Sequence, residues 1–455
     1  MKHIILILSD QHNGRVTSLE DSYIDTPNIE KIAQEGVWYP HAYCNAPLCG
    51  PSRMSFLSGA YPSDLHIFNN DASLPCDIPT LAHRMGANGY RCVLIGRMHF
   101  KGDDQLHGFD ERYVGDITSQ YWGTGGKQRE DFLMYQQTTN RKHCLQAVGA
   151  GISPVMVYDE AVYEEAMQFL AKPQKQPLFL VIGFYGPHFP YTCETSLYEK
   201  YSQRLLKQEW LLADEYYENY VQEADADLIH ACKASYYGLV ETLDTYIGSI
   251  YDQIKANLKE YLFVYTSDHG EQFGKRNIFG KQTLYEDAIR IPLIMAGTHL
   301  KPAIKQETVS LLDVGKTIAA ITDCNCTDMK GHYLKSQAIS SWIRSEILLD
   351  TTDGIRFAQC IVSWPYKLVK LHTKLQLFDL SCDSDEQYDI VNQHPDIVIM
   401  LSRHLVSEQQ ADECIRYEIQ QRTRHQLLKL WGQNKRPIEQ ATVTIPKGRL
   451  EKAKR

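Results

Sequence analysis

The fold is constrained most by a short apolar run that recurs along the chain and ends each time in polar residues. This run is found at Ile4–Ser9, Cys92–Ile95, Leu178–Ile182 and Leu262–Thr266. Unbroken apolar runs are typical of strands that are covered on both faces, and stretches with helical periodicity, such as Thr26–Glu35 and Tyr158–Leu170, lie between them. The alternation predicts an α/β fold in which a large, mainly parallel central sheet is flanked by helices.

Polar side chains follow each of these runs. They are Asp10 and Gln11, Arg97 and His99, His188, and Asp268 and His269. In a parallel sheet the carboxyl ends of the strands meet at one edge, where ligands bind, so we expect these residues to form one site. The carboxylates of Asp10 and Asp268 and the imidazole of His269 suit a divalent cation, although Asp268 before His-Gly is also compatible with an ordinary Asx turn.

After about residue 345 the sequence pattern changes. Two runs that predict the strands of a hairpin and two amphipathic stretches that predict helices follow, at Ile361–Leu371, Leu375–Leu380, Pro395–Leu405 and Ala411–Trp431. We therefore expect a catalytic domain at residues 1–345 and a small α+β domain at residues 346–455, ending in a helical, basic tail. The acidic, tyrosine-rich stretch Leu211–Leu228 predicts a solvated surface helix.

Composition excludes several classes of protein. The chain has 47 Lys and Arg against 56 Asp and Glu, a net charge of −9, which argues against a nucleic-acid partner. It has no apolar stretch long enough to cross a bilayer, and Ile4–Leu8 is too short for the core of a signal peptide. We expect a cytoplasmic protein with no membrane partner and with mostly reduced cysteines, while a homo-oligomeric state stays open.

The segment Cys49-Gly-Pro-Ser-Arg53, followed by Leu57-Ser-Gly59, is the most specific motif. Pro51 suits the first turn of a helix, which places Cys49 just before the helix N-terminus. The unpaired amides and the dipole of a helix N-terminus favour negative charge on whatever group Cys49 becomes. Arg53, one turn further on, is placed to hold that group.

This segment and several others resemble the sulfatase family of the alkaline-phosphatase superfamily. Cys49–Arg53 matches the family signature C-x-P-S-R, and the other matching segments are Asp25–Ile29, Gly186–Pro190, Thr266–Gly270, Lys281, Tyr285–Pro292 and Leu377–Leu380 with Asp385-Glu386 after it. Within the family the chain is most similar to choline sulfatases, through Asp77–His83, Met98–Phe100 and Asp104–Asp110. One departure is Arg97, where that branch has lysine, and it puts the preferred substrate in doubt.

The resemblance implies a post-translational modification and a metal ion. The signature cysteine, here Cys49, is oxidised to formylglycine by a formylglycine-generating maturase. One divalent ion, calcium or manganese ahead of magnesium, is bound by Asp10, Gln11, the modified Cys49, Asp268 and His269.

The resemblance also implies a mechanism. The hydrated aldehyde attacks the sulfur of a sulfate ester and is held by Arg53. Arg97, His188 and Lys281 stabilise charge on the sulfuryl oxygens, and His188 or Lys281 protonates the leaving alcohol. His99 then takes the proton of the second hydroxyl, which expels sulfate and restores the aldehyde.

The identity of the substrate is less constrained by the sequence. Asn69, Asn70 and Asp71 are predicted to line the mouth of the pocket, and Tyr121 and Trp122 are either an aromatic wall for a quaternary ammonium group or ordinary rim aromatics. A small sulfate ester such as choline sulfate is the expected substrate. Two alternatives are a phosphonate monoester or phosphodiester hydrolase of the same superfamily and a catalytically silent, anion-binding relative.

Overall fold

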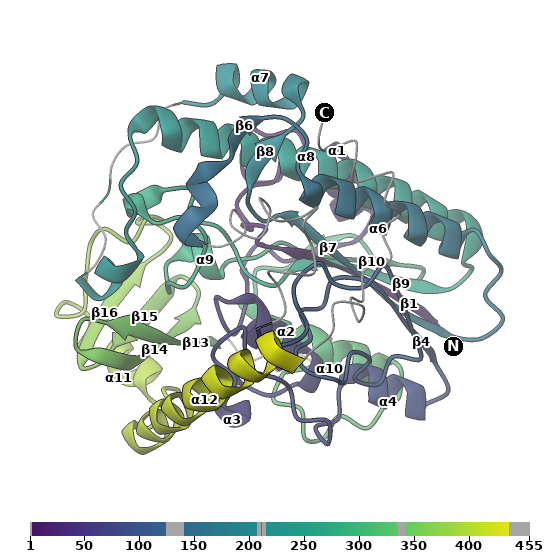
Figure 1. The fold of residues 1–455 in the computed structure, drawn as a ribbon. Helices are drawn as coiled ribbons and strands as arrows, with labels where there is room; N and C mark the ends of the chain where they lie inside the picture. The colour runs from purple at the N-terminus through teal and green to yellow at the C-terminus, as the bar shows by residue number, and fades with distance from the viewer. Residues whose placement is uncertain (1, 124–140, 207–210, 212–214, 335–341, 436–455) are drawn as a thin grey trace.

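The computed structural model describes residues 2–123, 141–206, 211, 215–334 and 342–435. Within them an eight-stranded sheet forms the centre of the molecule, in the order β11-β2-β10-β9-β1-β7-β4-β5 (Figure 1). The strands are β1 (His3–Asp10), β2 (Val37–Trp38), β4 (Arg91–Gly96), β5 (Glu111–Tyr113), β7 (Leu178–Pro187), β9 (Tyr261–Ser267), β10 (Leu293–Gly297) and β11 (Ala303–Ile304). The four predicted strands are β1, β4, β7 and β9, and they pair in parallel; only β10 joins its neighbours β9 and β2 antiparallel. The predicted mainly parallel α/β sheet is confirmed.

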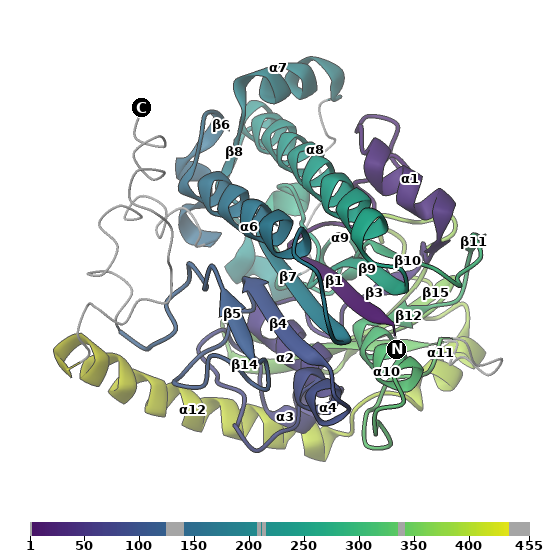
Figure 2. The same cartoon turned by 90° about the vertical axis from the view of Figure 1, so that its right-hand side faces the viewer.

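Helices cover both faces of this sheet. On one face lie α1 (Pro27–Glu35), α6 (Pro154–Leu170) and α8 (Ala226–Asn257), and on the other lie α2 (Cys49–Ser58), α4 (Leu81–Ala87) and α10 (Leu311–Ile321) (Figures 1 and 2). The side chains of β1 alternate between two separate cores: Ile4, Leu6 and Leu8 enter one, and Ile5 and Ile7 enter the other. A strand buried on both sides has no polar face, which is why the run carries no alternation.

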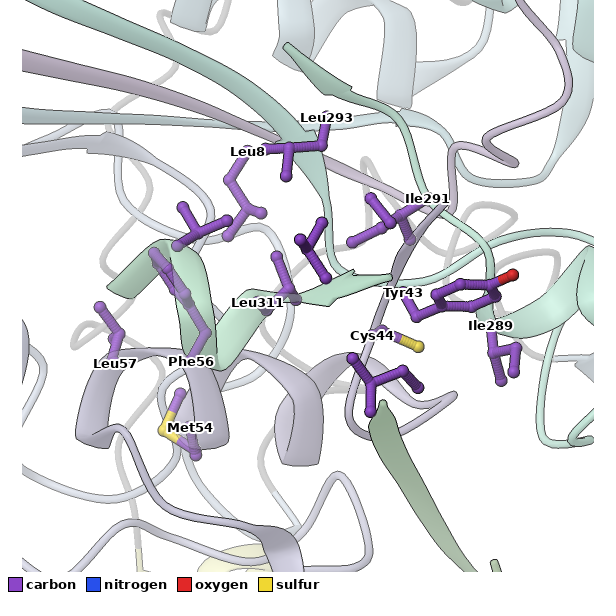
Figure 3. Packing of buried hydrophobic residues seen from close by; sticks show 14 of the residues in the cluster. Leu8, Tyr43, Cys44, Met54, Phe56, Leu57, Ile289, Ile291, Leu293 and Leu311 are labelled. Carbon is purple, nitrogen blue, oxygen red and sulfur yellow. The ribbon is translucent and has the colours of Figure 1, made fainter. Parts of the chain in front are cut away.

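Packing of α2 fixes where its N-terminus lies. Figure 3 shows Phe56 and Leu57 of α2 facing Leu8, Leu293 and Leu311 across the core. The helix ends at Gly59, whose left-handed conformation (φ 75°) suits a residue without a Cβ. Because this face of α2 is held against the sheet, its first turn lies at the carboxyl edge of the strands.

A second, antiparallel sheet lies beside that edge (Figure 1). Its strands, in order, are β13 (Ile343–Thr351), β14 (Gly354–Ser363), β15 (Tyr366–Leu371) and β16 (Lys374–Asp379), followed by α11 (Pro395–Ser402) and α12 (Glu408–Lys435). The predicted hairpin was too simple: the run Ile361–Leu371 holds the end of β14, a turn and the whole of β15. The predicted domain boundary at residue 345 stays a prediction.

The stretch Leu211–Leu228 is not a solvated helix where the structure describes it. Residues 215–220 form a short 3-10 helix, η3 (Glu215–Tyr220), and α8 begins only at Ala226. Tyr217 and Tyr220 are buried, and the Tyr217 hydroxyl accepts a hydrogen bond from the amide of Leu284. These tyrosines therefore pack inward. Acids and tyrosines are spread evenly along this stretch, so the sequence does not show which side chains are buried.

The remaining elements are short and connect these layers. They are β3 (Ala42–Tyr43), α3 (Pro62–Leu65), η2 (Arg141–Gln146), β6 (Val148–Ala150), β8 (Tyr191–Cys193), α7 (Thr195–Arg204), η4 (Lys275–Asn277), α9 (Glu286–Ile289) and β12 (Val309–Ser310). Among the helices described, none has the length and apolar character needed to span a membrane.

A buried ion cluster joins the second sheet to the central unit. The ammonium of Lys367 on β15 lies 3.1 Å from a carboxylate oxygen of Glu286 on α9 and 2.7 Å from one of Glu386. All three side chains are buried, and the second oxygen of Glu286 accepts from the Tyr43 hydroxyl at 3.2 Å. Removing the one cation would leave two carboxylates facing each other out of water.

We therefore predict that Lys367→Met lowers the free energy of unfolding by about 3–5 kcal/mol, the usual cost of leaving buried charge without its partner. Lys370→Met, on the same strand, removes a surface pair with Glu408 and is the matched control, with an expected effect of about 0–1 kcal/mol. Urea denaturation of both variants measures the difference. Equal loss of stability in the two would contradict the assigned role of Lys367.

Candidate active site

Two strand ends and one helix N-terminus bring four possible metal ligands together. Asp10 ends β1, Asp268 and His269 follow β9, and Cys49 is the first residue of α2. One ligand atom from each of these four residues lies within 4.8 Å of the others, and all four residues are buried. Cys49 thus stands inside the first turn of the helix, with Leu48 as the N-cap, one position further into the helix than the sequence predicts.

Arg53 fixes the orientation of both carboxylates. Its Nε donates to Oδ2 of Asp268 at 2.8 Å and its Nη2 to Oδ2 of Asp10 at 3.3 Å, while Nη1 and Nη2 also donate to the carbonyls of Arg97 and Ser9. The other oxygen of Asp10, Oδ1, is left facing Cys49 Sγ (3.6 Å) and His269 Nε2 (3.7 Å). The guanidinium predicted to hold the reacting group therefore holds the carboxylates around it.

The imidazole of His269 is oriented by its own backbone neighbour. Nδ1 lies 3.1 Å from the carbonyl oxygen of Gly270 and donates to it, so the lone pair of Nε2 is directed at the cluster, 3.1 Å from Cys49 Sγ. Burial lowers the pKa of His269 to about 4, so the ring is neutral at physiological pH. Neutral imidazole is the form that binds a metal ion.

The thiol of Cys49 is not activated by this setting. Burial, and after it the carboxylate of Asp10, raises the pKa of Cys49 to about 12. A cysteine nucleophile needs the thiolate at neutral pH, and this site holds the protonated form. An unmodified Cys49 is therefore a poor nucleophile here.

Lys281 and His188 form a second polar pair beside the cluster. Lys281 Nζ donates to Nε2 of His188 at 2.6 Å, and Nδ1 of His188 donates to the carbonyl of Phe189 at 2.8 Å. Lys281 also donates to the amide oxygen of Gln11, whose amide nitrogen donates to Glu271. Gln11, predicted as a metal ligand, has its oxygen bonded to Lys281 in this arrangement.

Arg97 connects the cluster to His99. Its Nε donates to Oδ2 of Asp10 at 2.6 Å, its Nη1 to Asp116 at 3.0 Å and its Nη2 to Nδ1 of His99 at 2.8 Å. Its guanidinium also lies over the ring of Tyr185, 4.4 Å from the centroid. Since Nδ1 of a neutral His99 accepts this bond, the proton sits on Nε2, which makes the ring a donor rather than a base.

Asp116 is a positioning residue that the sequence pattern does not single out. It accepts from Arg97 and from the backbone amide of His99 (2.7 Å), and it is buried. Asp116 follows β5, which is a parallel strand. Polar residues after parallel strands converge at one edge of the sheet, and this rule, which identified Asp10, applies to Asp116 as well. Because β5 is only three residues long, no apolar run marks it in the sequence.

These groups open onto a cavity of about 510 Å³. The predicted site residues that line it are Cys49, Asn70, Arg97, His99, His188 and Lys281. Asn69 lines it too, and Asn70 accepts from the amide of Gly50 at 2.9 Å. Gln11, Arg53, Asp10, Asp268 and His269 lie behind this surface.

Asp71 is not among the residues that line the cavity. Its carboxylate pairs with Lys429 of α12 at 2.6 Å and with Lys101 at 3.5 Å. Its carbonyl accepts from the indole of Trp122, whose ring stacks on His425, and Trp122 does not line the cavity either. These contacts favour the interpretation of Trp122 as a structural rim aromatic.

Asp159 of α6 holds the strand end that leads to His188. Its two carboxylate oxygens accept from the amides of Tyr185 (2.7 Å) and Gly186 (2.6 Å) at the end of β7. Burial raises the pKa of Asp159 to about 7, even though both hydrogen bonds act in the opposite direction. The folded protein therefore binds this proton more tightly than the unfolded chain does.

This shift predicts a pH-dependent loss of stability. The contribution of Asp159 is complete below its ordinary pKa and is lost as the pH rises through about 7. From pH 5 to pH 8 the wild type should lose roughly 2–3 kcal/mol of unfolding free energy relative to Asp159→Asn. Urea titrations at both pH values test this, with Asp252→Asn, an exposed carboxylate on α8, as the control; parallel pH profiles for wild type and Asp159→Asn would refute it.

Comparison with known proteins gives this site a family. The sequence model of the family described as Sulfatase matches residues 2–324. The choline-sulfatase of Rhizobium meliloti (strain 1021) is 26% identical over 426 residues, covering 84% of this chain and 80% of that protein. Arylsulfatase K of Xenopus laevis is 26% identical over 455 residues, covering 89% of this chain and 82% of that protein.

The fold is shared with solved structures at lower identity. The crystal structure of the phosphonate monoester hydrolase of Agrobacterium radiobacter aligns with a TM-score of 0.70 and 17% identity, covering 93% of this chain and 96% of that one. The family match spans most of the chain and includes all the residues gathered around Cys49. The chain therefore belongs to the sulfatase family and is a sulfuric ester hydrolase.

Proposed function

We propose that this enzyme hydrolyses a small sulfate ester through a formylglycine made from Cys49, with one divalent ion held by Asp10, Asp268, His269 and residue 49. The observation that carries the proposal is the convergence of these four ligand atoms within 4.8 Å at the N-terminus of α2. Choline sulfate is one candidate substrate, because a choline-sulfatase is among the relatives. The modification requires a separate maturase as a partner.

The donor set fits a divalent ion. Two buried carboxylates, each with one oxygen held by Arg53, face a neutral imidazole nitrogen. Oxygen ligands with one nitrogen suit calcium or manganese ahead of magnesium, which prefers to keep several waters. A bound ion supplies electrophilic stabilisation of negative charge on the sulfuryl oxygens.

A formylglycine at residue 49 supplies, once hydrated, an oxygen nucleophile and a second hydroxyl through which the sulfate can leave. Arg53 keeps the two carboxylates apart and oriented. Arg97, His188 and Lys281 line the cavity and bind the sulfuryl oxygens. The proton that Lys281 shares with Nε2 of His188 is the one donated to the leaving alcohol.

His99 is proposed as the base that accepts a proton from the second hydroxyl. In the described arrangement its Nδ1 accepts from Arg97, so this role requires the Arg97–His99 hydrogen bond to open. While the Arg97–His99 hydrogen bond is intact, the Nε2–H group of His99 is a further hydrogen-bond donor for the sulfate group of the substrate. Asp116 keeps both residues in place through its bonds to the Arg97 guanidinium and the His99 amide.

We predict that Cys49 is the single site of aldehyde formation in protein produced together with a formylglycine-generating maturase. An aldehyde-reactive probe, mapped by peptide mass, should label the peptide that contains residue 49, and the protein should release inorganic sulfate from an aryl sulfate. Cys49→Ser should lose the label and lower the steady-state rate of sulfate release (kcat) by at least about 10³, because the ester that a serine forms has no second hydroxyl to break it.

Cys76→Ser, which alters an exposed thiol, is the matched control and should keep both label and turnover. Full sulfate release by protein with an intact Cys49 thiol would contradict the proposal. Faster turnover of a phosphonate monoester or a phosphodiester than of any sulfate ester would replace it with the phosphonate or phosphodiester hydrolase alternative.

We also predict that calcium or manganese stabilises the enzyme. An ion that binds only the folded state raises Tm once its concentration passes its Kd. At 100 times Kd, it adds roughly 3 kcal/mol to the free energy of unfolding. A chelator should reverse the shift, and His269→Ala should reduce it strongly. His299→Ala, at an exposed histidine, should leave it unchanged. A Tm shift of equal size in wild type and His269→Ala would show that the ion binds elsewhere.

A further inference from the structure

The cavity extends from the catalytic groups to a rim built from four distant parts of the chain. Arg141 begins η2, Tyr220 ends η3, Asp350 lies on β13 and Arg422 lies on α12, and all four line the cavity. The catalytic proposal uses none of these residues. We refer to them together as the outer rim.

Hydrogen bonds and ring contacts join the outer rim into one wall. Arg141 lies over the ring of Tyr220, 4.5 Å from its centroid, and its Nη1 donates to the carbonyl of Tyr220 at 2.8 Å. The hydroxyl of Tyr220 accepts from the amide of Asp350 at 3.1 Å. The carboxylate of Asp350 accepts from both Nη atoms of Arg422, at 2.7 and 3.3 Å.

The two arginines of the outer rim differ in their charge balance. Arg422 is neutralised by Asp350 and by Glu418, which accepts from its Nε at 2.6 Å. Arg141 donates to the neutral carbonyls of Tyr220 and Asn219 and, among the described residues, forms no ion pair with a carboxylate. Burial lowers the pKa of Arg141, as expected for a cation that has lost water without gaining an anion. Lys142, next in the chain, lines the same cavity.

Three of the four aromatic rings that line the cavity are already used by the protein's own cations, and the fourth, Phe68, is buried and packs edge-on against Phe357. Arg97 lies over Tyr185 at 4.4 Å, Lys281 lies 5.2 Å from the centroid of Phe189, and Arg141 covers Tyr220. A quaternary ammonium group is bound by open aromatic faces or by a carboxylate. Asp350 is the one carboxylate that lines this cavity among the described residues, and it is bonded twice to Arg422.

We propose, on the basis of the proposed sulfatase function, that the outer rim is a subsite for a second anionic group of the substrate, bound by Arg141. The substrate is then a small sulfate ester that carries a carboxylate or a second sulfate at the end remote from the scissile group. A guanidinium binds either group through paired, charge-assisted N–H bonds. A cationic alcohol such as choline would meet like charge at the same place.

Binding of non-hydrolysable analogues to the full-length protein tests this without turnover. Calorimetry would compare alkane disulfonates from propane to octane with monosulfonates of the same chain length, with sulfo-carboxylates, and with sulfonates that end in a trimethylammonium group. The best disulfonate or sulfo-carboxylate should bind at least about tenfold more tightly than its monosulfonate, and the trimethylammonium series more weakly. The comparison of the two anionic series identifies which group the subsite prefers.

Arg141→Met should reduce the tenfold preference for a dianion over its monosulfonate to less than about twofold. Arg141→Lys should keep part of this preference, because lysine retains the charge but lacks the paired donors. Arg424→Met removes an exposed arginine from α12 and is the charge-matched control, which should keep the full preference. Circular dichroism and Tm establish that each variant is folded, and the wild-type ligand series stands on its own should Arg141→Met fail to fold.

Two results would overturn the subsite. In the first, none of the dianions binds more tightly than the monosulfonate of the same chain length. In the second, the trimethylammonium compounds bind more tightly than those monosulfonates. The outcome is separable from that of the catalytic proposal. If the protein forms the aldehyde and hydrolyses a sulfate ester of an uncharged phenol but shows no preference for dianions, only the subsite proposal is refuted. If the protein prefers dianions but forms no aldehyde at Cys49, only the catalytic proposal is refuted.

Discussion

The guanidinium of Arg53 lies between the carboxylates of Asp10 and Asp268, with all three side chains buried. Two carboxylates at the ends of adjacent parallel strands would repel each other strongly in a dry interior, and a buried charge is tolerated only when it is paired and hydrogen-bonded. Arg53 supplies that pairing from α2, so the same contact also ties the first turn of α2 to the sheet. The place of Cys49 depends on this ion cluster together with the apolar packing of α2.

Charge balance then explains the surrounding residues. Arg53 and Arg97 both donate to Oδ2 of Asp10, and with Lys281 nearby they hold the pKa of Asp10 well below its usual range despite burial, which alone would raise it. The oxygens that remain, Oδ1 of Asp10 and of Asp268, both approach Nε2 of His269. The protein thus uses its own cations on one side of the carboxylates, and the other side faces His269 and Cys49, where the candidate metal site lies.

Much of this centre is predictable from the sequence because one rule covers it: polar residues after buried parallel strands converge. The rule predicts the convergence of Asp10, Asp268, His188 and His99 from the amino-acid pattern alone. It does not reach Asp116, because β5 is too short to show an apolar run. Asp71, predicted to line the mouth of the pocket, is not among the residues that line the cavity. Its partner Lys429 lies on a helix far away in the sequence, and no local pattern reports such a pair. The outer rim escapes prediction for the same reason, since it combines η2, η3, β13 and α12.

Arg97 shows what a change of residue type does within such a centre. Its three nitrogens donate in three directions, to Asp10, Asp116 and His99, while the plane of the guanidinium lies over Tyr185. The single ammonium of a lysine has no planar fork with which to span these partners. Arginine here therefore joins a carboxylate of the candidate metal site, the positioning carboxylate and the predicted base into one hydrogen-bonded unit. Most of its donors are already bonded to protein, so it has few left for a bound anion. This agrees with the proposal that Arg141, further out in the cavity, contributes to selectivity for the substrate.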